Sequence, residues 1–150
     1  MTALELAQQL KAKFGDGLSE PVDFRGELTL KVADPERLPE ICAAAKKELG
    51  FDYLVDITSI DNYGEDPRFT IVYHLYGYGH LLYLRLKTDI SEETAELPTI
   101  TGVWRTADWQ RSFLRMRSTR HISRWCMVGP GNPRGRFRHR SAAISSGARE

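Results

Sequence analysis

Cysteine is scarce in this sequence of 150 residues, which contains only Cys42 and Cys126. Two thiols cannot build the disulfide framework of a small secreted domain or supply four cysteine ligands to a metal, so we expect both to be structural. Long apolar runs are also missing. No segment approaches the roughly 18–20 apolar residues of a membrane span, and the first residues lack the apolar core of a signal peptide. These absences favour a cytoplasmic globular protein.

Lysine and acidic residues are nearly absent beyond Gln110. Residues 1–110 contain 11 Lys+Arg and 19 Asp+Glu, a net charge of −8, whereas residues 111–150 contain 10 Arg and one acid, a net charge of +9. The two values add to the +1 of the whole chain. A compositional break of this kind marks a boundary. We therefore predict a domain over residues 1–110 and an Arg-rich tail, irregular or disordered, over residues 111–150.

Amphipathic periodicity predicts the first elements of the domain. Apolar residues at helical spacing indicate a helix over Ala3–Phe14, and alternation indicates a strand over Gly26–Val32. A second helix should begin after the capping residue Asp34, with Pro35 in its first position, and should end at Gly50.

Three strands are predicted next, over Phe51–Ile60, Arg68–Tyr76 and His80–Lys87. Turn-forming residues separate them, at Asp61–Pro67 and in the tight hairpin Gly77–Gly79. The order helix, strand, helix and three strands predicts an α+β fold. We expect a two-layer domain whose helices pack on one face of a mainly antiparallel sheet.

The segments VDITSID, RFTIVYHLYG, LRLK and LPTITGVWRTADW follow one another between Gly50 and Gln110. In this order they resemble subunits C of the proton-pumping NADH:quinone oxidoreductases, respiratory complex I, which form the 30-kDa subunit family. The resemblance implies an α+β domain in a non-catalytic subunit of the peripheral arm. Its neighbours would be subunits D, B and I, of which the first reacts with quinone and the other two hold iron–sulfur clusters.

The resemblance also implies a role in electron transport. The complex passes electrons from NADH through FMN and iron–sulfur clusters to quinone, such as ubiquinone, and couples this to proton translocation. The cofactors lie in partner subunits, so this chain is expected to bind none and to have no catalytic residues of its own. It would lie on the cytoplasmic face of the inner membrane, attached peripherally and only through the complex.

The chain departs from the family after Gln110, where a helix with a Glu-Arg-Glu signature is expected and RSFLRMRSTRHISRW stands instead. Codons for Arg111-Ser112-Phe113, read one nucleotide later, can encode Glu-Val-Phe, which is close to that signature. The tail is therefore either a frameshift product or a natural divergent basic segment. Resequencing of the gene region distinguishes the two.

Three residues are candidates for a subunit interface: Asp56, Trp104 and Trp109. Asp56 is expected to be a hydrogen-bonded or interface carboxylate, and the two tryptophans to be core residues or interface anchors. His74 and His80 flank the second hairpin, but no carboxylate or cysteine at a suitable spacing completes a metal site.

Aromatic residues are concentrated in the three-strand region, and core and cross-strand packing is their expected use. They are Phe51, Tyr53, Phe69, Tyr73, Tyr76, Tyr78 and Tyr83. A nucleic-acid stacking platform is disfavoured because a domain with a charge of −8 repels phosphates. Two alternative functions remain open: a homologous subunit of a membrane-bound hydrogenase-type complex, and a nucleic-acid-binding module that uses the basic tail.

Overall fold

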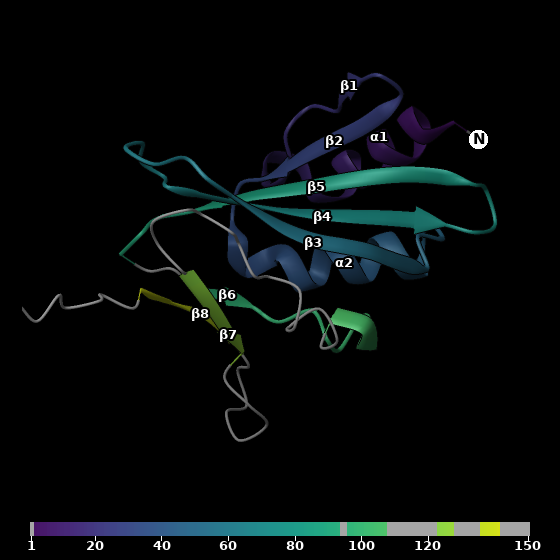
Figure 1. Ribbon diagram of the computed structural model, residues 1–150. Helices are drawn as coiled ribbons and strands as arrows, with labels where there is room; N and C mark the ends of the chain where they lie inside the picture. Colours follow the sequence, from purple (N-terminus) through teal and green to yellow (C-terminus); the bar gives the residue numbers. More distant parts are fainter. Residues whose placement is uncertain (1, 94–95, 108–122, 128–135, 142–150) are drawn as a thin grey trace, which may run out of the picture.

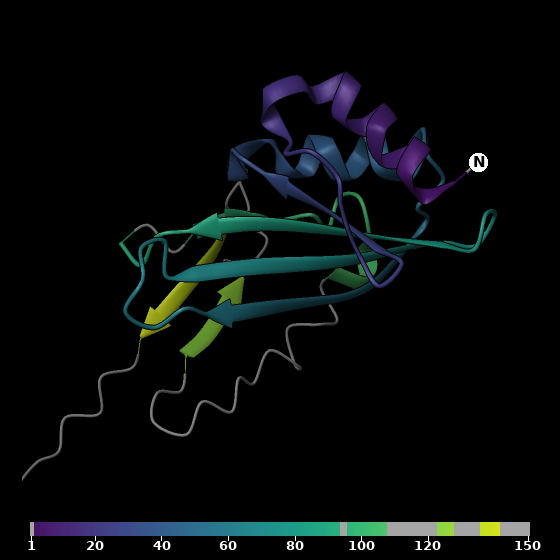
Figure 2. The ribbon, with the colours of Figure 1, turned by 90° about the horizontal axis from the view of Figure 1, so that it is seen from above.

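A five-stranded sheet with both helices on one face forms the body of the protein (Figures 1 and 2). The computed structural model describes residues 2–93, 96–107, 123–127 and 136–141. The sheet has the order β1-β2-β5-β4-β3. Its strands are β1 (Val22–Phe24), β2 (Glu27–Val32), β3 (Tyr53–Asp61), β4 (Phe69–Gly77) and β5 (Leu82–Ile90). The helices are α1 (Ala3–Phe14) and α2 (Leu38–Lys47), which confirms the predicted α+β fold.

Capping residues set the helix ends. Helix α1 has the predicted bounds, and a capping box fixes its start: the Glu5 N–H donates to Thr2 Oγ1 (3.3 Å) and the Thr2 N–H donates to Glu5 Oε2 (2.6 Å). Asp34 caps a 3-10 turn, η2 (Pro35–Arg37), so α2 itself starts at Leu38, later than predicted. Helix α2 ends at Lys47, before the predicted end at Gly50. Gly50 lies beyond the turn that follows and has a φ of 75°, a conformation that glycine adopts without steric cost.

The strands pair mostly, but not only, in the antiparallel sense. β3, β4 and β5 form the predicted antiparallel meander, whereas β2 pairs with β5 in parallel. Strand β1 was not predicted. It forms a hairpin with β2 through Arg25 and Gly26, which both have positive φ (57° and 82°), as the primed hairpin turns require.

The core lies between the two helices and the face of the sheet toward them. Its largest fully buried side chains include Leu10 and Ile41 from the helices and Tyr73, Leu75 and Leu86 from the sheet. Phe51, from the segment between α2 and β3, is also fully buried. Alternate residues of β4 and β5 point into this layer, which confirms the predicted inward direction of Leu84 and Leu86.

Cys42 lies in this core with no solvent exposure, and burial raises the pKa of its thiol far above the usual range. Because only the thiolate is nucleophilic, we expect Cys42 to resist iodoacetamide in the native protein and to react after unfolding in urea. Peptide mapping by mass spectrometry locates the label. Rapid labelling of Cys42 without denaturant would contradict this burial.

A smaller antiparallel sheet has the order β6-β8-β7. Its strands are β6 (Glu96–Pro98), β7 (Ser123–Met127) and β8 (Arg136–Ser141). Strands β7 and β8 lie in the segment for which the sequence predicts an irregular or disordered tail. The remainder of that segment and Trp109 lie outside the described residues. Among the described residues, no helix has both the length and the apolar character needed to cross a bilayer.

Candidate interaction face of the sheet

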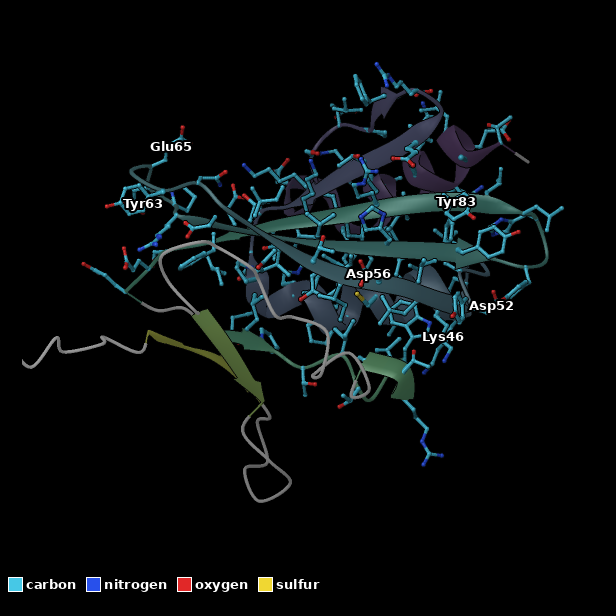
Figure 3. The ribbon with its side chains drawn as sticks, in the orientation of Figure 1. Lys46, Asp52, Asp56, Tyr63, Glu65 and Tyr83 are labelled. Atoms are coloured by element: carbon cyan, nitrogen blue, oxygen red, sulfur yellow. The ribbon has the colours of Figure 1, made fainter. Side chains whose placement is uncertain are left out.

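The face of the large sheet opposite the helices is covered by neither of them (Figure 2). Strand alternation places polar and aromatic side chains here, in rows that cross β3, β4 and β5. Figure 3 shows Tyr83 and Asp52 toward one end of this sheet, Tyr63 and Glu65 toward the other, and Asp56 between them. We call this surface the open face.

Four tyrosines meet at one end of the open face, and we call them the tyrosine cluster. Tyr76 lies in the middle: its ring centroid is 4.6 Å from that of Tyr83 and 5.1 Å from that of Tyr78. Tyr53 joins the cluster through Tyr78, at 5.6 Å. Tyr53, Tyr78 and Tyr83 are exposed, at 41%, 60% and 54%, so one side of the cluster faces solvent.

A polar row lies next to the cluster. Asp56 is opposite His74 in the β3–β4 register, and His74 is opposite Arg85 in the β4–β5 register. Arg85 forms an ion pair with Glu27, but its buried Nε has no hydrogen-bond partner among the described residues. The Asp56 side chain is half-buried on the open face and has no hydrogen bond or ion pair within the described part of the chain. Its assignment to a subunit interface stays a prediction.

Asp89 anchors a second polar group further along β5. Its carboxylate is 2.5 Å from Lys31 Nζ and accepts a hydrogen bond from Thr70 Oγ1 (2.7 Å). Partial burial raises the pKa of Asp89, but the bonds from Lys31 and Thr70 outweigh burial, so the pKa lies below its usual range.

This lowered pKa makes part of the stability dependent on pH. The contribution of Asp89 is complete above its unfolded pKa of about 4 and is lost as the pH falls through the lower folded value. We expect Asp89→Asn to lower the free energy of unfolding at pH 7, with a difference from wild type that shrinks below about pH 4. Urea titrations across this range measure it. Asp16→Asn, at an exposed carboxylate with no partner in the described residues, is the control for the loss of one carboxylate; an equal loss of stability at pH 7 in both variants would refute the assignment.

Arg68 organises the opposite end of the sheet. Its guanidinium donates to both carboxylate oxygens of Asp61 (2.8 and 3.1 Å) and to Glu92 (2.6 Å), and it lies over the rings of Tyr63 and Phe69. The hydrogen bonds to Asp61 raise the pKa of Arg68 above its usual range, and its side chain is only 16% exposed. The contacts of Arg68 hold the β3–β4 loop in place, while the Tyr63 side chain remains 81% exposed.

His74 and His80 have separate surroundings. His74 lies on the open face, whereas the His80 ring packs against Phe51 (centroids 4.9 Å apart) and its Nε2 lies 3.0 Å from the carbonyl oxygen of Leu49. Since the Leu82 N–H donates to His80 Nδ1, the proton on Nε2 is the one that binds Leu49. The described residues contain no group of three potential metal ligands.

Trp104 occupies the core, which is one of the two uses that the sequence left open for it. The indole is 3% exposed, and its Nε1–H donates to the backbone carbonyl of Asp52 (3.0 Å). Lys46 lies over the ring and donates to the Val103 carbonyl (2.6 Å). The Trp104 ring therefore joins the segment after β6 to the start of β3 and is not exposed on the surface of this chain.

The aromatic set of the three-strand region divides by strand alternation. Phe51, Phe69 and Tyr73 are buried on the helix side, whereas the tyrosine cluster makes cross-strand contacts on the open face. Both kinds of packing were predicted. The cluster itself was missed. A hairpin turning at Gly77–Gly79, as predicted, would place Tyr76 opposite His80, whereas the observed turn spans Tyr78–Leu81 and brings Tyr76 opposite Tyr83.

An α+β domain with one helix-covered and one open sheet face is the class of protein that this geometry defines. Residues 31–111 match the family model of the respiratory-chain NADH dehydrogenase 30-kDa subunit, and the chain belongs to this family. The match ends next to Gln110, where the composition changes.

The curated relatives are subunits C of NADH-quinone oxidoreductases. That of Geotalea uraniireducens is 37% identical over 101 residues, 67% of this chain and 61% of the relative. The one numbered 2 in Rhizobium meliloti is 46% identical over 77 residues, 50% of this chain and 42% of the relative. The chain thus spans about three fifths of the length of the first relative.

Two solved structures share the fold. The trypsin-resistant fragment of Nqo5 is 27% identical, with a TM-score of 0.60 over 73% of this chain and 86% of the fragment. A chain of the archaeal membrane-bound sulfane sulfur reductase has a TM-score of 0.61 over 73% of this chain and 64% of its own length. At 20% identity, the second likeness concerns the fold alone.

Proposed function

We propose that this chain is a non-catalytic subunit in the peripheral arm of a proton-pumping NADH:quinone oxidoreductase. In this role it holds neighbouring subunits in place while electrons pass from NADH, through FMN and iron–sulfur clusters bound by those subunits, to quinone. The family match over residues 31–111 is the observation that carries the proposal. The proposed partners are subunits D, B and I, which are the quinone-reacting subunit and two iron–sulfur subunits.

The open face supports a role in assembly. It combines exposed aromatic rings with the half-buried carboxylate of Asp56. Aromatic residues are enriched at protein interfaces. The proposed location is the cytoplasmic face of the inner membrane, where the chain is attached through the complex.

A related membrane-bound complex is the second candidate. The same fold occurs in a chain of the membrane-bound sulfane sulfur reductase, so a hydrogenase-type or sulfur-reducing assembly is compatible with this domain. The two candidates differ in the subunits that accompany the chain, and this difference can be measured directly.

Co-purification from native membranes tests the proposal. The full chain, tagged at its own locus, is isolated after mild detergent extraction, and the bound proteins are identified by mass spectrometry against an untagged strain. We expect subunits D, B and I. Hydrogenase-type or sulfur-reducing subunits would establish the second candidate. Recovery of the folded chain alone, or with nucleic acid, would refute both.

A further inference from the structure

We propose that the tyrosine cluster binds an arginine side chain of a neighbouring protein subunit. This inference rests on the proposed function and adds to it the surface used and the chemistry of the partner. The cluster lies at the end of the open face where β4 turns into β5, next to Leu81, which is 68% exposed. Exposed aromatic and aliphatic side chains gathered in one place are typical of interaction sites.

The cluster is organised before any partner arrives. The plane of the Tyr76 ring makes an angle of 86° with that of Tyr78 and of 43° with that of Tyr83. These contacts hold the rings in place. Tyrosine offers a large contact area with few rotatable bonds, and prior packing further reduces the entropy lost on binding. The exposed sides of Tyr53, Tyr78 and Tyr83 are therefore a preformed platform.

The charges around the platform favour a cation. The Asp52 carboxylate lies beside the cluster, since its Oδ1 accepts the N–H of Tyr78 (3.0 Å), and aromatic faces are themselves negative. Two cations of this region are already engaged. On the same face of β5, Arg85 is paired with Glu27, and Lys46, which lies near Asp52 in Figure 3, donates to a backbone carbonyl.

Arginine fits this platform better than the other groups that stack on tyrosine. The planar guanidinium stacks on an aromatic face while its N–H groups still donate to a carboxylate or a hydroxyl, which a lysine ammonium cannot do in the same way. Nucleic-acid bases also stack on tyrosine. However, residues 1–110 carry a net charge of −8, and the Asp52 carboxylate repels a phosphate backbone.

Titration of the full chain with a short peptide tests the proposal without the complex. The probe is Gly-Arg-Gly-Arg-Gly with blocked ends, and its control contains citrulline, which keeps the planar shape but lacks the charge. We expect aromatic NMR signals of the cluster to shift, with affinity on the order of tenfold higher for the arginine peptide. Tyr63, exposed at the other end of the sheet, is the internal control and should not shift.

Leucine variants locate the site. Tyr78→Leu and Tyr83→Leu keep apolar area at exposed positions but remove the aromatic face, so we expect each to weaken arginine-peptide binding severalfold. Tyr63→Leu should bind as wild type does. Equal affinity for the citrulline peptide, or equal loss in Tyr63→Leu, would overturn the proposal. Preferential binding of oligothymidylate would overturn it in favour of base stacking.

The same variants separate this inference from the proposed function. In the membrane co-purification, the Tyr78→Leu/Tyr83→Leu double variant should recover several times less of the partner subunits, while Tyr63→Leu recovers the wild-type amount. Undiminished recovery with the double variant would leave the proposed function standing and refute the role of the cluster. Peptide binding without any co-purifying subunit would refute the proposed function and retain the arginine site.

Discussion

Replacing Gly77 with alanine is expected to destabilise the protein by about 3 kcal/mol or more. A Cβ at this position would lie 2.2 Å from Cε1 of His80 and 2.6 Å from the backbone oxygen of Gly50, both far inside contact distance. The ring cannot move away cheaply, because it packs on Phe51 and binds the Leu49 carbonyl. Urea unfolding followed by circular dichroism measures the loss.

Gly79 is the matched control in the same hairpin. A Cβ there meets nothing within 4 Å and its φ is not positive, so Gly79→Ala should stay within about 0.5 kcal/mol of wild type. A His80→Ala background should reduce the cost of Gly77→Ala but not abolish it, since the Gly50 oxygen remains in place. Wild-type stability of Gly77→Ala would show that the histidine is not held as described.

Trp104→Ala is expected to cost about 3–5 kcal/mol of unfolding free energy. The substitution empties a site in which the side chain is only 3% exposed, and it removes the hydrogen bond from Nε1 to the Asp52 carbonyl. It also detaches the segment after β6 from the corner between α2 and β3. Thermal unfolding and tryptophan fluorescence measure the effect.

Trp104→Phe divides this cost into its parts. Phenylalanine retains most of the apolar contact but cannot donate to Asp52, so the expected loss is about 1–2 kcal/mol. Full loss in Trp104→Phe would assign the stabilisation to the hydrogen bond and the indole shape. No loss in Trp104→Ala would place the ring outside the core.

The sequence predicts the local elements well because local forces decide them. Helix α1 has the predicted bounds since its stripe and its capping residues are all contiguous. The parallel pairing of β2 with β5 was outside the reach of periodicity, which determines the buried face of a strand but not its neighbour. Strand β1 was missed because all three of its residues are exposed and show no alternation in burial.

The candidate site was predictable only in part, for the same reason. Alternation along β3 correctly places Asp56 and Asp61 on opposite faces of the sheet. Asp56 is paired with the open-face residue His74, and Asp61 with the buried residue Phe69. The depth of Trp104 depends on a contact with Asp52, 52 positions earlier in the chain, which no local pattern contains. Likewise, the bond of Arg68 to Glu92 exists only after the meander has closed.

The parallel pairing of β2 with β5 has a consequence for how the chain folds during synthesis. The meander β3–β4–β5 contains only short-range pairings, so it can form rapidly and alone, whereas β2 must wait for a strand made more than fifty residues later. Until then the edge of β2 that pairs with β5 has no partner strand, and the sheet that buries Leu28 and Leu30 is incomplete. We expect the docking of β2 to limit the folding rate, and the nascent N-terminal half to be the stage that most needs chaperone protection.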